Sequence, residues 1–168
     1  TGRLHLKNAI DVCGTGGSIL PRINTSTISA LILSSRFGIG VAKHGNKAAS
    51  GRFGSFDLLE SLGISLTENV REIERKYEKE NLALLFAPFF HPAMKHFAEV
   101  RRKIGKPTFF NLLGPLLNPA FPKRQIIGTS FKDKMHLIAE TCRLLGKEKV
   151  YVVCGEDGLD EVTLAGRT

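Results

Sequence analysis

The chain has no tryptophan, and aromatic residues make up only 8% of its 168 positions. Its basic and aromatic side chains are not interleaved, as they would be in a platform that stacks the bases of single-stranded nucleic acid. The formal charge of +8 nevertheless favours an anionic partner. Charge alone does not choose between nucleic acid, membrane headgroups and a phosphorylated small molecule.

Cysteines and long apolar runs are also scarce. Cys13, Cys142 and Cys154 contain no C-x-x-C pair, which argues against a disulfide framework or a zinc site and for a reducing compartment. We expect three buried thiols. The apolar runs at 28–33 and 82–87 are far shorter than the roughly 20 residues that cross a bilayer. We therefore expect a cytoplasmic protein without a membrane partner.

The two ends suggest a piece of a longer protein. The chain begins at Thr1, and TGRLHLKN lacks the charged-then-apolar pattern of a signal peptide. With 42% hydrophobic residues, the 168 positions are enough for one core. We expect residues 1–168 to form one α/β domain that is incomplete at both ends.

Strand-like and helix-like segments alternate along the chain. Apolar runs bounded by glycine, proline or polar residues predict strands at 8–13, 39–43, 82–87, 124–130 and 149–155. Capped and periodic stretches predict helices at 24–38, 54–63, 65–80, 91–105 and 132–146. The alternation predicts an α/β fold with a mainly parallel central sheet and helices on both faces.

Some of these segments carry more detailed expectations. The strand at 82–87 is so apolar that we expect it to be buried on both faces. The helix at 65–80 should begin at a capping box of Ser65 and Glu68. Residues 109–119 are broken by Gly114, Pro115 and Pro119, which predicts a short helical turn followed by a rigid loop.

The loop after the first predicted strand is rich in glycine. Residues 14–18 read GTGGS, and the next helix begins with NTST at 24–27. Ligands of such sheets bind at the carboxyl ends of the strands. Glycines let backbone N–H groups approach an anion, and a helix N-terminus adds its dipole. The pattern predicts a phosphate site, with an ordinary turn and helix cap as the alternative.

The stretch KHGNKAAS at 43–50 follows the second predicted strand. It is too polar for a core strand, so we expect a loop. Lys43 offers a charge, Asn46 offers an amide, and Gly45 permits close backbone approach. This loop is a second candidate ligand wall, although a solvated loop would have the same composition.

Two charged clusters complete the set. Arg101, Arg102 and Lys103 are adjacent and cannot share one helix face, so one of them is expected to point inward unless all are surface charge. Residues 155–161 read GEDGLDE. Their four carboxylates repel one another unless a cation binds, and such oxygen ligands suit Mg²⁺. An exposed acidic turn is the alternative for this loop.

These motifs, taken in order, resemble a known family. The stretches that match are GTGG…NTST, VAKHGNKAAS, GSFDLLESLG, FAPFFHPAMK, VRRKIG…FNLLGPLLNP and DGLDE. They are similar to those of anthranilate phosphoribosyltransferases, which belong to the nucleoside-phosphorylase-like phosphoribosyltransferases. The resemblance implies Mg²⁺-dependent transfer of the phosphoribosyl group from phosphoribosyl pyrophosphate to anthranilate, in tryptophan biosynthesis, by a homodimer. KHGN and FNLLGPLLNP carry the most weight.

The resemblance also implies residue roles. Phosphoribosyl pyrophosphate would be bound by Gly14, Gly17, Ser18, Asn24, Thr25, Ser26, Thr27, Lys43, His44, Gly45, Asn46, Lys47, Ala48, Ala49, Ser50, Gly51 and Ser55. Anthranilate would be bound by Gly14, Asn46, Ala87, Pro88, His91 and Arg101. Magnesium would be bound by Ser26, Asp160 and Glu161. No general base is assigned.

Three positions depart from the family pattern, because Ser18, Arg22 and Gly51 stand where aspartate, threonine and serine are common. The resemblance implies a helical part before this chain and further strands after it, so we expect these residues alone to be inactive. A pyrimidine nucleoside phosphorylase is one alternative, although it would need a Ser-Gly-Arg loop in place of KHGN. A non-catalytic nucleic-acid-binding relative is another, although KHGN and DGLDE argue against it.

Overall fold

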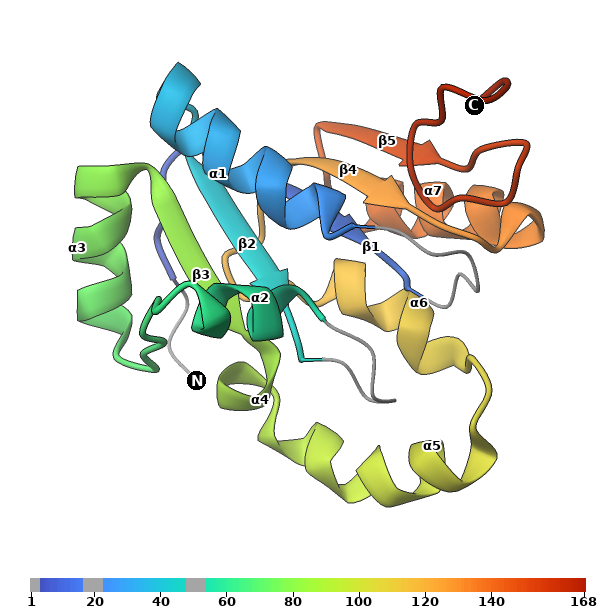
Figure 1. The fold of residues 1–168 in the computed structure, drawn as a ribbon, viewed down its shortest axis with the longest axis horizontal. Coiled ribbons are helices and arrows are strands. Elements are labelled where there is room, and N and C mark those ends of the chain that lie inside the picture. The colour runs from blue at the N-terminus through green and yellow to red at the C-terminus, as the bar shows by residue number, and fades with distance from the viewer. Residues whose placement is uncertain (1–3, 17–22, 48–53) are drawn as a thin grey trace.

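A computed structural model of the chain describes residues 4–16, 23–47 and 54–168 (Figure 1). The described residues form a five-stranded parallel sheet of order β3-β2-β1-β4-β5. Its strands are β1 Ile10–Gly14, β2 Val41–Gly45, β3 Leu82–Phe86, β4 Arg124–Gly128 and β5 Lys149–Val153. The predicted α/β class with a parallel sheet is confirmed. Seven residues named above lie outside the described ranges: Gly17, Ser18, Arg22, Ala48, Ala49, Ser50 and Gly51.

The order of strands reverses beside β1. From β1 the chain adds β2 and then β3 on one side, and it returns to place β4 against the other side of β1. The β1–β4 register pairs Ile10 with Arg124 and Gly14 with Gly128, so the two strands end side by side. In open α/β sheets such a reversal opens a crevice at the carboxyl ends, where ligands bind.

Helices cover both faces of the sheet (Figure 1). On one face, Ala30 of α1 (Thr25–Phe37) packs on Val12 and Val41. On the other face, α3 (Val70–Glu80) packs Ile73 and Tyr77 on β2 and β3. Helices α6 (Phe109–Leu116) and α7 (Met135–Leu144) pack around Ile127 on that same face. Each face buries aliphatic residues that alternate along the strands, which is the main stabilising contribution to such a fold.

The predicted helix at 91–105 is right in extent but wrong as a single α-helix, because it begins as a 3₁₀ helix (Pro92–Phe97) and continues as α5 (Ala98–Ile104). A short helix that the sequence does not predict, α4 (Ala87–Phe90), precedes it. His91 separates α4 from the 3₁₀ helix with φ −127° and ψ 59°. The cause is Pro92, whose ring disfavours helical geometry in the residue before it. The remaining helices are α2 (Ser55–Ser61) and a 3₁₀ turn (Lys132–Lys134) that precedes α7.

The capping box of Ser65 and Glu68 is also wrong. Helix α3 begins five residues later than the predicted start of 65, at Val70. The Asn69 side chain caps it by accepting a hydrogen bond from the Glu72 N–H at 3.2 Å. Asparagine is among the strongest N-cap residues, and here it lies closer to the apolar repeat than Ser65 does.

Two strand predictions need correction. Strand β3 is not buried on both faces, because it lies at the sheet edge and its residues alternate between buried and half-buried. Strand β2 extends through Lys43 and His44 to Gly45, which pair with β3, so the polar stretch does not begin as a loop. Lys43 and His44 are buried because hydrogen bonds satisfy their polar atoms, which composition cannot reveal.

Smaller expectations had mixed outcomes. Residues 109–116 form an eight-residue helix, more than the short turn expected. All three cysteines are free; Cys142 and Cys154 are buried, whereas Cys13 is half-buried. No helix among the described residues has the length and apolar character to span a membrane.

Gly40 and Tyr77 provide a test of this packing. A Cβ at Gly40 would overlap the Tyr77 hydroxyl, which donates to the Lys7 carbonyl at 2.7 Å. Gly40→Ala should lower the free energy of unfolding by about 1–3 kcal/mol because the ring must move. Tyr77→Phe should cost about 1 kcal/mol. Urea denaturation of both variants and of the double variant checks this.

The double variant should cost less than the sum of the two single variants, since removing the hydroxyl removes both the closest clash and the bond that the clash disrupts. Additive costs would show that Gly40 and Tyr77 do not meet.

Candidate functional site

The loop after β5 closes over the ends of β1 and β4. A Cβ at Gly128 would overlap the Asp160 carbonyl oxygen, and a Cβ at Gly14 would lie 3.2 Å from Asp160 Oδ2. Asp160 is buried there. Two glycines at the strand reversal thus let the loop backbone approach closely. As a result a carboxylate lies beside the described start of the glycine loop, Gly14–Gly16.

The four carboxylates of the loop do not converge. Asp157 accepts hydrogen bonds from the Leu159 N–H at 3.1 Å and from the Thr163 hydroxyl, and Glu156 accepts from the Arg167 N–H at 3.3 Å. These two side chains stabilise the loop. Across the described ranges, no group of three or more His, Cys, Asp or Glu side chains could enclose a metal ion. Asp160 and the half-buried Glu161 are left as the predicted magnesium ligands.

Hydroxyl groups just after β4 contact the glycine turn. Thr15 Oγ1 lies 3.2 Å from Thr129 Oγ1, the Thr15 N–H donates to the Gly128 carbonyl at 2.8 Å, and Ser130 Oγ donates to the Gly16 carbonyl at 3.5 Å. Sequence reasoning missed Thr129 and Ser130. The signal for them is GTS at 128–130, which also places a glycine and two hydroxyls at a strand end.

The N-terminus of α1 lacks a side-chain cap. Asn24 stands at the N-cap, yet its Nδ2 donates to the Gly54 carbonyl at 3.4 Å and its side chain accepts nothing from the helix. Thr25 Oγ1 donates to Ile23. Thr27 is fully buried, and its hydroxyl has no hydrogen-bond partner among the described residues. The Thr25 and Thr27 N–H groups already donate to backbone carbonyls. The dipole of the helix end and the unpaired Thr27 hydroxyl are suited to an anion here.

Lys43 brings a buried charge to the same helix turn. Its side chain is 2% exposed, and Nζ donates to the Val12 carbonyl at 3.3 Å and to Ser26 Oγ at 3.2 Å. Burial lowers the pKa of Lys43, and the negative charge of buried Asp11 opposes that shift. The predicted ligand residue Lys43 therefore contacts the predicted ligand residue Ser26, with both near the uncapped N-terminus of α1.

His44 and His91 come together from two different segments. Their Nε2 atoms lie 3.2 Å apart, and the rings meet edge to face at a centroid distance of 5.1 Å. His44 Nδ1 lies 3.2 Å from the Gly114 carbonyl, to which it donates. Burial, and then the neighbouring His91, lower the pKa of His44 to about 4. Burial also lowers the pKa of His91. The pair is neutral near pH 7.

Asn46, Lys47 and Ser55 lie at the end of β2. The Asn46 carbonyl accepts from Ser55 Oγ at 3.2 Å, and Asn46 Oδ1 accepts from the Lys47 N–H at 2.8 Å. A Cβ at Gly45 would lie 2.8 Å from Ser55 Oγ, so this approach needs glycine. Lys47 forms an ion pair with Glu60 at 2.7 Å.

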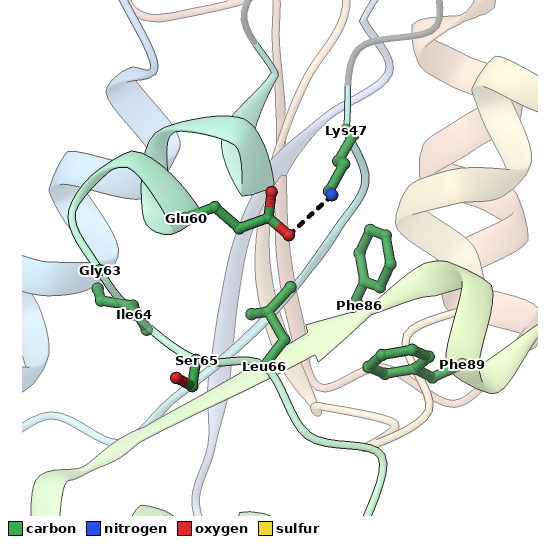
Figure 2. A pocket seen from close by; sticks show the side chains of 8 residues that line it. All are labelled: Lys47, Glu60, Gly63, Ile64, Ser65, Leu66, Phe86 and Phe89. Carbon is green, nitrogen blue, oxygen red and sulfur yellow. Dashed lines mark ion pairs between the residues drawn. The ribbon is translucent and has the colours of Figure 1, made fainter.

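Figure 2 shows the pocket that Lys47 and Glu60 border, with Phe86 and Phe89 below them. Its volume is about 580 Å³, and Gly63, Ile64, Ser65 and Leu66 complete its lining. Because Glu60 neutralises the ammonium, Lys47 lies in this pocket with its charge already paired.

The predicted acceptor residues are spread over two helices. Ala87 and Pro88 begin α4, and His91 follows it. Arg101 lies in α5, half-buried, with its guanidinium 5.3 Å from the centroid of the Phe110 ring. Lys103 is exposed and pairs with Glu99 at 2.9 Å. His91 thus contacts His44 of β2, whereas no contact among the described residues connects Arg101 to β2.

Comparison with known proteins agrees with this geometry. Residues 6–168 match a family model described as the glycosyl transferase family, a/b domain. The chain belongs to this family. The match covers almost all of the chain, so the fold and the strand-end loops described above are the family's α/β domain. The resemblance predicted from the motifs is confirmed.

Individual relatives carry one name. An anthranilate phosphoribosyltransferase of Geobacillus stearothermophilus is 48% identical over 161 residues, which cover 96% of this chain and 47% of the relative. The solved enzyme of Thermus thermophilus has a TM-score of 0.79 at 43% identity, over 86% of this chain and 44% of that one. The Saccharomyces cerevisiae enzyme in complex with PRPP and Mg has a TM-score of 0.83 at 35% identity, over 92% and 44%. The chain spans about half the length of these relatives.

The histidine pair predicts a pH dependence of stability. His44 has a pKa of about 4 in the folded chain against an ordinary value of 6.5, so between these values the unfolded chain takes up a proton that the folded chain does not. The free energy of unfolding should fall as the pH drops through this window, by roughly 3 kcal/mol in total from His44. Urea denaturation from pH 7 to pH 4.5 measures the slope.

His44→Gln should flatten the slope, leaving the smaller part that His91 contributes. His96→Gln removes an exposed imidazole and serves as the control, with a slope like that of the parent. Equal slopes for the parent and His44→Gln would contradict the burial of a neutral His44.

Proposed function

We propose that the protein carrying this chain is an anthranilate phosphoribosyltransferase, which transfers the phosphoribosyl group of phosphoribosyl pyrophosphate to the amine of anthranilate. One observation carries the proposal. The uncapped N-terminus of α1, with Lys43 buried against Ser26, lies on the sheet whose glycine turn meets the Asp160 carboxylate. Anion donors and a carboxylate for a cation are what a magnesium diphosphate requires. The relatives named above support this assignment and not a nucleoside phosphorylase.

The donor would bind across β1 and β2. Backbone N–H groups of the glycine turn, with the hydroxyls of Ser26 and Thr27 at the N-terminus of α1, would donate to phosphate oxygens. The bond from the anomeric carbon to the pyrophosphate oxygen breaks, a bond to the anthranilate nitrogen forms, and one amine proton passes to solvent water. Negative charge grows on the departing pyrophosphate, so fixed N–H donors stabilise the transition state more than the ground state.

Magnesium fits the residues present. Carboxylate and hydroxyl oxygens are its preferred ligands, and Asp160, Glu161 and Ser26 would supply them. Because the described chain offers no cluster of three acidic or imidazole side chains, substrate phosphates would complete the coordination, as is usual for Mg²⁺. The bound ion would neutralise charge on the leaving pyrophosphate.

The acceptor would bind on the other side of β2. Asn46, Ala87, Pro88 and His91 would line its approach, and the Arg101 guanidinium would pair with its carboxylate. The neutral His44–His91 pair adds no positive charge beside the amine, which must remain unprotonated to attack. Positioning of a weak aromatic nucleophile would contribute more than a general base.

The wider biology belongs to the same proposal. We assign the protein to tryptophan biosynthesis in the cytoplasm, as a homodimer without nucleic-acid or membrane partners. Residues 1–168 would be its donor-binding α/β domain, inactive without a helical part and further strands. Two exposed side chains support an additional part of the protein. Ile126 of β4 and Tyr151 of β5 lie on the α1 side of the sheet and leave apolar surface that this part could cover.

Arg101 tests the acceptor assignment. Its guanidinium forms a fork of donors that fits a carboxylate, which a lysine ammonium cannot reproduce. In the full-length gene product, Arg101→Lys should raise the anthranilate KM by about tenfold or more and leave the donor KM unchanged. Steady-state kinetics with each substrate varied in turn measures both.

Arg143→Lys is the matched control, because Arg143 is exposed and paired with Glu140. If Arg101→Lys leaves both KM values unchanged, or raises both equally, Arg101 does not bind the acceptor.

Asp160 tests the magnesium assignment. Asp160→Asn keeps the shape of the side chain and removes its charge, so the Mg²⁺ concentration for half-maximal turnover should rise at least about tenfold, equivalent to roughly 1.4 kcal/mol. Calorimetric titration of the donor at fixed Mg²⁺ gives an independent binding readout.

Asp157→Asn is the control, since Asp157 bonds only within its loop in the contacts described here. It should lower Tm and leave the magnesium dependence alone. Equal magnesium shifts in the two variants would refute a specific role for Asp160.

A further inference from the structure

The motif FNLLGPLLNP supplies no residue to the proposed site. Its helix nevertheless contacts both the glycine turn and β2, which carry the proposed ligand residues. Helix α6 packs Leu112 and Leu116 near Ile127 on the sheet face opposite α1. Polar contacts from the two ends of α6 lead to β1, β2 and β4. The motif is therefore placed to set where the ligand loops stand relative to one another.

Asn111 makes the contact at the first end. Its Nδ2 donates to the Thr15 carbonyl at 3.3 Å, inside the glycine turn. Its Oδ1 accepts the Thr108 N–H at 3.0 Å and so caps α6. The oxygen of this amide thus stabilises the start of α6, and its nitrogen holds the glycine turn.

The other end of α6 contacts β2 and β4. A helix leaves its last carbonyls without partners in the helix. Here the Gly114 carbonyl accepts from His44 Nδ1 at 3.2 Å, and the Pro115 carbonyl accepts from Gln125 Nε2 at 2.7 Å. Beyond the helix, Asn118 Nδ2 donates to the Ala42 carbonyl at 2.8 Å. The C-terminal end is fixed to the sheet by buried polar groups.

We propose that Asn111 is a positioning residue for the glycine turn: through its amide, α6 holds the Thr15 carbonyl at a set place relative to His44. The inference rests on the proposed function, because it is the phosphoribosyl pyrophosphate site that the turn would shape. On its other side the turn is held by Gly128, Thr129 and Ser130. Asn111 connects the turn to α6, and α6 in turn contacts His44 of β2.

The Thr15 carbonyl shares one peptide plane with the Gly16 N–H, so holding the carbonyl also sets the direction of that N–H. Donors that should face a phosphate lose their alignment when that plane rotates, and hydrogen bonds weaken steeply with angle. Loss of the Asn111 contact should therefore weaken donor binding while leaving the fold of the sheet in place.

The test is Asn111→Asp in the full-length gene product. Aspartate keeps the oxygen that caps α6 and replaces the Nδ2 donor by an oxygen that repels the Thr15 carbonyl. The Kd for phosphoribosyl pyrophosphate with Mg²⁺, measured by calorimetry, should rise at least about tenfold. The donor KM should rise with it, the anthranilate KM should stay unchanged, and Tm should stay within a few degrees.

Asn69→Asp is the matched control, since Asn69 also caps a helix but lies at α3. It should leave donor binding unchanged. Asn111→Ser removes the amide without adding a charge, and it is measured in the same assays if Asn111→Asp fails to fold.

The outcomes separate the two proposals. If the parent protein binds no donor, the proposed function fails and this inference fails with it. If the parent binds donor and the folded Asn111 variant binds it equally well, Asn111 has no positioning role. Equal rises in the donor and acceptor KM, or a large loss of Tm, would make the role merely structural and overturn the inference.

Discussion

The parallel pairing of β1 with β4 is the constraint on which the rest depends. It places Gly14 beside Gly128 at the carboxyl ends of both strands. Because neither residue has a side chain, the loop after β5 can bring Asp160 to within contact of both. Larger residues would push this loop away, and the carboxylate would leave the glycine turn. The strand order, the two glycines and the buried Asp160 therefore form one unit, and the proposed cation site depends on all three.

The buried charges of the site oppose folding, yet one of them supplies a cation for the ligand. Lys43 and Asp11 are almost fully buried on neighbouring strands, and burial lowers the pKa of the lysine and raises that of the aspartate. Desolvation of each ion opposes folding, and their mutual attraction offsets part of it. Asp11 also accepts from Gln125 Nε2 at 3.0 Å, while Lys43 donates to Val12 and Ser26. A core that carried apolar residues here would be easier to stabilise, but it would offer no cation beneath the first turn of α1.

The site is built on ends of regular elements, where backbone groups lack partners. The N-terminus of α1 has no side-chain cap and offers its dipole and the Thr27 hydroxyl to an anion. The last turn of α6 leaves carbonyls that His44 and Gln125 satisfy. The same rule thus produces opposite results at the two helices, since one end stays open and the other is closed against the sheet. A helix end fixed to the sheet together with an open helix end suits a site that must hold a flexible diphosphate in one geometry.

The alternation of strands and helices, the glycine loop and the family could be predicted from the sequence, because these depend on local period and on residue types at fixed spacing. The sequence misplaced the start of α3 and the end of β2, because capping competition and the satisfaction of buried polar groups depend on neighbours, and it did not predict α4. It offered four carboxylates for a metal but could not separate Asp157, which bonds its own loop, from Asp160, which reaches Gly14. The folded chain distinguishes these two carboxylates, and it pairs His44 with His91 and Asn111 with Thr15, because residues 47 and 96 positions apart meet through packing that no local pattern encodes.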